Sequence, residues 1–229
     1  MKDNCVLMAE SVTEGHPDKL CDTIADAVLD ACLALDRSAH VACEVMATAG
    51  KIIAAGEITA SRFPDIPAVL CQTVREAGYG GADYEVEVIT HAQSPDIAGA
   101  VDGSGELGAG DQGIVYGYAC EETPELLPLP VVLAHRLTRL LTEARKRNTI
   151  PGIRPDGKAE VAIEYRNGRP KRVAAVVVSC QHEEEMELPE LRRAVVRHVI
   201  EPAFRDFPLD DETKILINPS GRFVEGGFE

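Results

Sequence analysis

The hydrophobic pattern of this 229-residue chain describes one structural unit twice. In the first half, apolar residues at helical spacing predict a helix over 18–35, and two strand-like runs follow at 40–48 and 51–59. A second helix over 66–77 and a strand over 84–90 complete this unit. The predicted order of elements is therefore α-β-β-α-β.

The second half of the chain repeats the same order. Its predicted elements are a helix over 128–147, strands over 159–165 and 172–180, a helix over 188–204 and a strand over 214–217. The paired strands are joined at Ala49-Gly50 in the first half of the chain and at Asn167-Gly168 in the second half, and both dipeptides are typical of hairpins. Hairpins alternating with helices predict an α+β fold in α/β layers, with helices covering one face of each sheet.

A glycine-rich segment separates the two units. It is long for a simple connection, and loops of this size often act as lids over a binding site, although an ordinary linker has the same composition. We therefore predict a first domain over 1–98, a linker or gate loop over 99–112, and a second domain over 113–229.

The formal net charge of −15 argues against a nucleic-acid partner, because the phosphate backbone would be repelled over most of the surface. It is compatible with a nucleotide bound through Mg²⁺, since a few carboxylates can hold a cation that neutralises phosphates. No apolar run reaches the length of a membrane span, so we expect a cytoplasmic protein without membrane contact. The seven scattered cysteines contain no C-x-x-C pair and predict neither disulfides nor a zinc site.

The segment 10–19 carries the most informative motif of the chain. Pro17 stands where a first helical residue is expected, so His16 lies at the N-terminus of the predicted helix. That end of a helix attracts anions, to which His16 and Lys19 add donors, and Asp18 can ligate a metal that bridges phosphate oxygens. An ordinary capped helix with a solvated first turn has the same residues, and both interpretations stay open on this motif alone.

Several other acidic residues are candidates for binding groups. Glu44 and Glu57 each interrupt an apolar strand, where a carboxylate either faces solvent or is buried beside a cation. Asp111 and Asp156 lie in predicted loops, where binding residues concentrate. The run 182–185, His-Glu-Glu-Glu, has metal-ligand chemistry, but we interpret it as a solvated first turn of the helix that follows.

Taken together, these segments resemble the S-adenosylmethionine synthetase (methionine adenosyltransferase) family. The matching segments occur in the family's order along the chain, and they are Glu10–Lys19, Gly56–Thr59, Gln93–Ile97, Gly108–Gly113, Ala134–Leu137, Arg154–Lys158 and Asn218–Phe223. A single tetrapeptide can match by chance, but seven collinear matches do not.

The resemblance implies a reaction in which the sulfur of L-methionine attacks the 5′ carbon of ATP, and the triphosphate released is then hydrolysed to pyrophosphate and phosphate. It implies Mg²⁺ and K⁺ as cofactors, a homodimer or higher oligomer, and three similar domains around a pseudo-threefold axis. It also implies roles for individual residues. The catalytic groups are His16 and Lys158; ATP is bound by His16, Lys19, Asp156, Lys158, Arg222 and Phe223; methionine by Glu57, Gln93 and Asp111; Mg²⁺ by Asp18; and K⁺ by Glu44.

The chain departs from the family's pattern after Gly226-Gly227, where family members continue through a third domain. That domain carries a second Mg²⁺ carboxylate and most of the cations that hold the triphosphate. We therefore expect two of three domains, and a hetero-oligomer in which a separate chain supplies the third. A truncated inactive fragment, or a non-catalytic paralogue that regulates a full-length synthetase, is the alternative.

Overall fold

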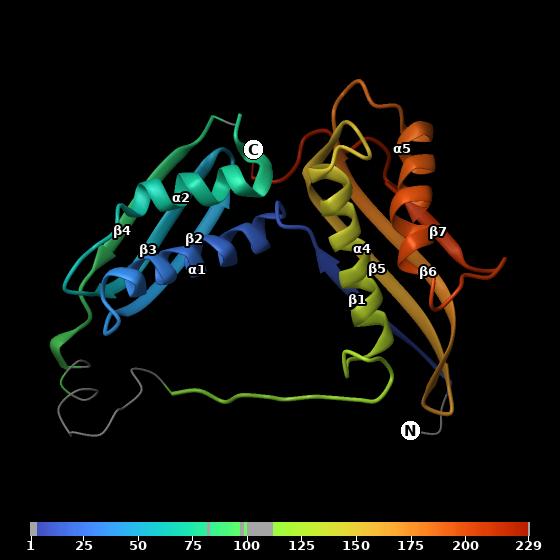
Figure 1. Cartoon of the computed structure of the whole chain (residues 1–229), viewed down its shortest axis with the longest axis horizontal. Helices are drawn as coiled ribbons and strands as arrows, with labels where there is room; N and C mark the ends of the chain where they lie inside the picture. Colours follow the sequence, from blue (N-terminus) through green and yellow to red (C-terminus); the bar gives the residue numbers. More distant parts are fainter. Residues whose placement is uncertain (1–3, 82, 97–98, 100–111, 229) are drawn as a thin grey trace. The chain divides into compact units, whose positions relative to one another are not determined.

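A computed structural model of the chain describes residues 4–81, 83–96, 99 and 112–228. Its contacts divide the chain into two units. The first contains Met1–Lys19, Ala77–Tyr79 and Tyr118–Glu229, and the second contains Leu20–Glu76 and Gly80–Gly117. Both units combine helices with a sheet, so the predicted α+β class is confirmed (Figure 1). None of the helices in the described ranges is long and apolar enough to cross a membrane.

The second unit contains a three-stranded sheet in the order β2-β3-β4. Strands β2 (His40–Thr48) and β3 (Lys51–Thr59) form the predicted hairpin, and β4 (Glu85–His91) runs parallel to β3. Helices α1 (Pro17–Leu35) and α2 (Ile66–Val74) lie over one face of this sheet (Figure 1). The α2 helix continues as the π-helix η1 (Arg75–Tyr79), in which Gly78 has a φ of 114°.

The first unit repeats this arrangement with one strand more. Strands β5 (Ile153–Arg166) and β6 (Arg169–His182) form a long hairpin, and β7 (Lys214–Ile217) runs parallel to β6. The additional strand is β1 (Cys5–Val12), which pairs antiparallel with β5. The hydrophobic pattern predicted no strand here. The sheet therefore has four strands instead of the three predicted, in the order β1-β5-β6-β7.

Both hairpins turn at the predicted dipeptides. The φ values are 47° and 68° at Ala49 and Gly50, and 54° and 74° at Asn167 and Gly168. Two successive positive φ angles are typical of the type I′ turn, whose twist matches that of the flanking strands.

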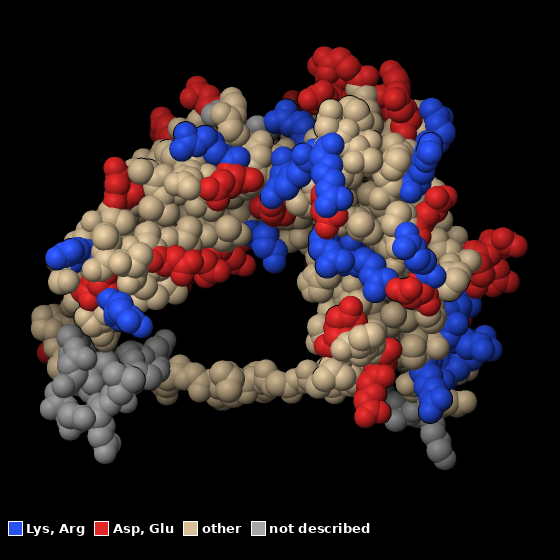
Figure 2. Space-filling view, in the orientation of Figure 1, with Lys and Arg blue, Asp and Glu red and all other residues tan. Residues whose placement is uncertain are grey.

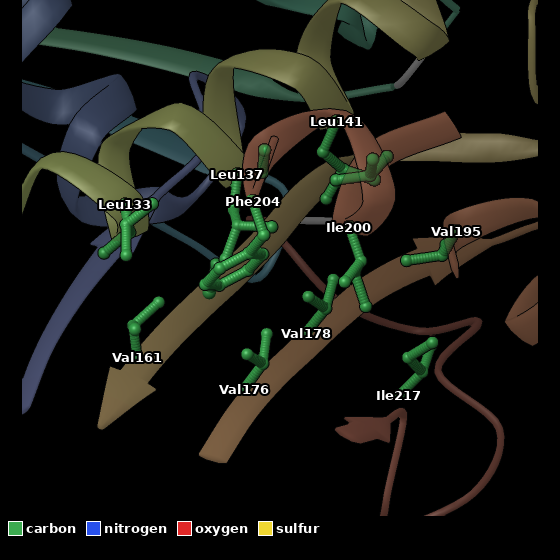
Figure 3. Close-up of a cluster of buried hydrophobic side chains, with 14 of the residues drawn as sticks. Leu133, Leu137, Leu141, Val161, Val176, Val178, Val195, Ile200, Phe204 and Ile217 are labelled. Atoms are coloured by element: carbon green, nitrogen blue, oxygen red, sulfur yellow. The ribbon is translucent and has the colours of Figure 1, made fainter. Parts of the chain in front are cut away.

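The helices of the first unit cover one face of its sheet. They are α4 (Leu129–Lys146), α5 (Leu188–Val195) and two short continuations of α5, η2 (Val196–Ile200) and α6 (Glu201–Ala203). Leucines of α4 point toward valines of β5 and β6, and Phe204 and Ile200 belong to the same cluster (Figure 3). This cluster is the larger core, and it fixes the end of β5 on which the candidate site is built.

Shortening Leu137 tests the role of this core. Leu137 is fully buried, so the Leu137→Ala variant should lose about 2–5 kcal/mol of unfolding free energy through lost burial and an unfilled cavity. Leu140, on the same helix but only partly buried, provides the matched control and should lose less. Urea denaturation of both variants measures the difference, and equal losses would contradict the assigned core.

Candidate functional site

The turn before α1 is anchored on strand β5. Thr13 donates through its backbone N–H to the Gly157 carbonyl at 2.9 Å and through its hydroxyl to the Pro155 carbonyl at 2.7 Å. The His16 N–H donates back to the Thr13 carbonyl at 3.1 Å, which closes the turn immediately before the helix. We call this turn, residues 13–16, the His16 turn. His16 therefore lies at the N-terminus of α1, as its sequence predicts.

Gly15 lies directly against β5. A Cβ atom at this position would be 2.3 Å from Pro155 Cβ and 2.6 Å from the Pro155 carbonyl, distances that no real side chain tolerates. Glycine is thus required for the close approach between the turn and the strand. The contact brings His16 next to the neighbouring residue of β5, Asp156.

The polar groups at the start of α1 differ in exposure. The His16 side chain is 20% exposed, and its Nδ1 accepts a hydrogen bond from the Asp18 backbone N–H at 3.3 Å. Since Nδ1 accepts, Nε2 is the ring nitrogen that can donate to an anion. The Asp18 carboxylate is 90% exposed and is open to a cation from solvent.

Asp156 is the buried carboxylate of this group, at 7% exposure. Burial raises its pKa above the ordinary value, while the Gly227 N–H at 2.9 Å and the charges of His16 and Lys158 oppose that rise. Asp156 and Lys158 lie two residues apart on β5, and Gly15 packs against the preceding Pro155, so His16 lies close to both. The Lys158 ammonium is also 3.4 Å from a carboxylate oxygen of Glu10 on β1.

The raised pKa of Asp156 has a consequence for stability. The fold favours the neutral carboxyl, so the stabilising contribution is complete at acidic pH and is lost as pH rises through the folded-state pKa. The Asp156→Asn variant stays neutral and can still accept from Gly227. Its melting temperature relative to the wild type should therefore rise between about pH 4 and pH 7. The exposed Asp211→Asn variant is the control, and a pH-independent difference would contradict the burial effect.

Arg222 and Phe223 follow strand β7. Arg222 is exposed and lies 3.1 Å from a carboxylate oxygen of Glu184. Phe223 is held through its backbone: its N–H donates to His182 Nε2 at 3.1 Å, and its carbonyl accepts from the His182 N–H at 2.9 Å. Our interpretation of His182 as part of a solvated helical turn is therefore wrong, because it ends β6 and is fully buried.

The expected methionine and K⁺ residues belong to the second unit. In the β2-β3 register Ala42 pairs with Glu57 and Glu44 pairs with Ala55, so both glutamates lie on the same face of the sheet. Glu44 is exposed, and Glu57 is 34% exposed, with a carboxylate oxygen 3.4 Å from His91 Nε2. Both carboxylates thus point away from the face that the helices cover.

The remaining expected residues are Lys19, Gln93 and Asp111. Lys19 is exposed in the first turn of α1, and the Gln93 N–H donates to the Thr59 hydroxyl at 3.0 Å, next to the end of β3. Asp111 and most of the expected gate loop lie outside the described residues.

The donor set fits a magnesium ion held mainly by its substrate. Among the described residues there is no group of three or more His, Cys, Asp or Glu side chains arranged to hold a metal. Mg²⁺ commonly takes only one or two protein carboxylates and completes its shell with phosphate oxygens and water. A single exposed carboxylate beside a helix N-terminus, as at Asp18, suits that mode.

Charge over the visible surface is mixed. Acidic and basic side chains are interspersed on both units, and the visible face has no broad basic surface of the kind that nucleic-acid binding requires (Figure 2). Two of the cations expected at the site, Lys158 and Arg222, each lie beside a glutamate.

Two family models match most of the chain. The family model for the N-terminal domain of S-adenosylmethionine synthetase matches residues 4–98, and the model for its central domain matches residues 106–223. The chain belongs to the S-adenosylmethionine synthetase family. It is 49% identical over 242 aligned positions to the S-adenosylmethionine synthases of two strains of Thermus thermophilus. The alignments cover 97% of this chain and 61% of each relative's length.

Synthetase motifs alone did not reveal the residues that support the His16 turn. Tyr79 donates its hydroxyl to the Gly15 carbonyl, and Arg145 contacts the Glu14 carboxylate. Both partners are distant in sequence, so no local pattern could pair them. The local signal was Gly78, which follows the predicted helix over 66–77. A glycine there is typical of a helix end and says nothing about the contacts of Tyr79.

Proposed function

We propose that the chain forms the methionine-binding part and half of the ATP-binding part of a methionine adenosyltransferase. This transferase makes S-adenosylmethionine from ATP and L-methionine and releases phosphate and pyrophosphate. The observation that carries the proposal is the position of His16 at the start of α1, beside Asp156 and Lys158.

That arrangement suits the chemistry of the leaving group. Expelling triphosphate from the 5′ carbon of ATP leaves several negative charges, which fixed donors stabilise better than water does. His16 Nε2, the free N–H groups of the first turn of α1 and the Lys158 ammonium would supply such donors. Lys19 and Arg222 add positive charge, and Asp156 and Phe223 would contact the nucleoside.

The proposed cofactors are Mg²⁺ and K⁺. Asp18 would hold Mg²⁺ against phosphate oxygens, and Mg²⁺ would neutralise part of the triphosphate charge. Glu44 would contribute one oxygen to a K⁺ site. In the same unit, Glu57 and Gln93 would hold the amino and carboxylate ends of methionine, and Asp111 would lie near the same substrate.

Further cations are needed to complete the site. His16, Lys19, Lys158 and Arg222 are few against a triphosphate, and two of them already lie beside glutamates. We propose that the missing groups come from the region of the Thermus thermophilus synthases that this chain does not cover, and that a polypeptide carrying that region can supply them. The expected assembly is a homodimer or higher oligomer that includes it.

Reconstitution tests the proposal. The chain is incubated with ATP, L-methionine, Mg²⁺ and K⁺, alone and together with a polypeptide for the third family domain, and S-adenosylmethionine is quantified by chromatography. We expect product from the mixture and little from the chain alone. A stable complex that makes no product would overturn the proposed catalytic role and favour a regulatory paralogue. Full activity of the chain alone would show that no further cations are needed.

A further inference from the structure

Tyr79 contacts the peptide group that precedes His16. Its side chain is 2% exposed, and its hydroxyl donates to the Gly15 carbonyl at 2.5 Å. The Gly15 carbonyl and the His16 N–H belong to one planar peptide group, and the N–H donates to Thr13 on the other side. Both ends of this peptide are therefore fixed by hydrogen bonds, one of them from Tyr79.

The Tyr79 ring is itself held in place. It packs edge-to-face against Phe228, with ring centroids 4.8 Å apart, and Phe228 is 1% exposed. A Cβ atom at Gly227 would lie 2.1 Å from the Tyr79 hydroxyl, so only glycine fits beside it. The same Gly227 donates its N–H to Asp156. One small cluster thus contacts both the His16 turn and the neighbouring carboxylate.

Arg145 of α4 supports the same cluster from another side. Its guanidinium donates to the Glu14 carboxylate and, at 3.0 Å, to the Ala77 carbonyl, and its side chain is 16% exposed. Gly78 has a φ of 114°, which favours glycine, and a Cβ atom there would also meet the Arg145 guanidinium. Arg145 therefore joins the residue before Gly15 to the segment that carries Tyr79.

We propose that Tyr79 is a positioning residue for His16. By fixing the Gly15–His16 peptide, it sets the direction in which the imidazole points and thereby the affinity of the site for triphosphate. This inference rests on the proposed function, in which His16 binds the triphosphate. Phe228 and Arg145 act indirectly, because they hold the ring and the backbone of the Tyr79 segment.

The test replaces single hydroxyl groups. Tyr79→Phe removes only the donor to Gly15, and Tyr165→Phe is the matched control, since its buried hydroxyl donates to Glu122 at 2.6 Å away from His16. Hydrogen exchange of peptides covering 13–19 reports on the turn, and calorimetry with inorganic tripolyphosphate and Mg²⁺ reports on binding. In Tyr79→Phe we expect faster exchange at 13–19 and about fivefold weaker tripolyphosphate binding, as for one lost hydrogen bond. Tyr165→Phe should change neither, whatever its effect on melting temperature.

Each outcome decides a separate point. Unchanged exchange at 13–19 in Tyr79→Phe would overturn the inference. If the wild type binds tripolyphosphate, an unchanged affinity in Tyr79→Phe would overturn it as well. Faster exchange in a chain whose wild type binds no tripolyphosphate would instead overturn the proposed function, while supporting the structural link from Tyr79 to the turn.

Discussion

The His16→Ala variant is expected to form S-adenosylmethionine about 100 to 1,000 times more slowly than the wild type in the reconstituted enzyme, the loss typical of removing one fixed donor to a developing negative charge. Because the substitution removes the Nε2 donor, the loss should appear in kcat. Methionine affinity should change little, since Glu57 and Gln93 lie in the other unit.

Steady-state rates at saturating ATP and methionine measure this effect. His198 lies in η2, outside the proposed site, so His198→Ala is the control and should retain full activity. A His16→Ala variant with normal kcat would remove His16 from the proposed catalytic groups. If only the KM for ATP rises, His16 binds ATP without favouring the transition state.

The Gly15→Ala variant is expected to lose about 100-fold in kcat/KM, because the added methyl group cannot fit against Pro155 without moving the turn. A displacement of about 1 Å is enough for such a loss when it moves a group that must meet the reacting atoms. The melting temperature should also fall, since the hydrogen bonds from Thr13 to β5 would be strained.

Gly81→Ala is the matched control for this variant. No atom lies within 4 Å of the position that its Cβ would take, so both activity and melting temperature should stay close to wild type. Circular dichroism verifies that the Gly15→Ala variant keeps its secondary structure. A folded variant with wild-type kcat/KM would contradict the tight packing of Gly15 on β5.

Elements with a local signature were predictable from the sequence. The predicted bounds of β2 and β3 agree with the structure residue for residue, because two mainly apolar runs flank a two-residue turn. Strand β5 is longer than predicted because it includes Pro155 and Gly157, and a register shift accommodates them. Such residues normally indicate loops, and only the pairing partner reveals the strand.

Long-range relations were not predictable in the same way. The motif placed His16 at a helix start, and the structure agrees. Nothing in the motif indicates that Gly15 packs against Pro155 or that Tyr79 donates to its carbonyl, since these contacts join residues far apart in the chain. The proposed roles of the site residues therefore rest on the family resemblance together with this geometry.

The position of β1 at the edge of the first unit's sheet has a consequence for how the chain acquires its structure. Its partner β5 is synthesised much later, so β1 stays unpaired until β5 is available. The residues of the second unit are all synthesised before that point. Val6 and Met8 are among its apolar residues, and an unpaired apolar strand readily associates with other chains. Pairing over so large a sequence separation is also slow. The His16 turn follows β1 directly, so we expect this part of the candidate site to become organised only after β1 has paired with β5.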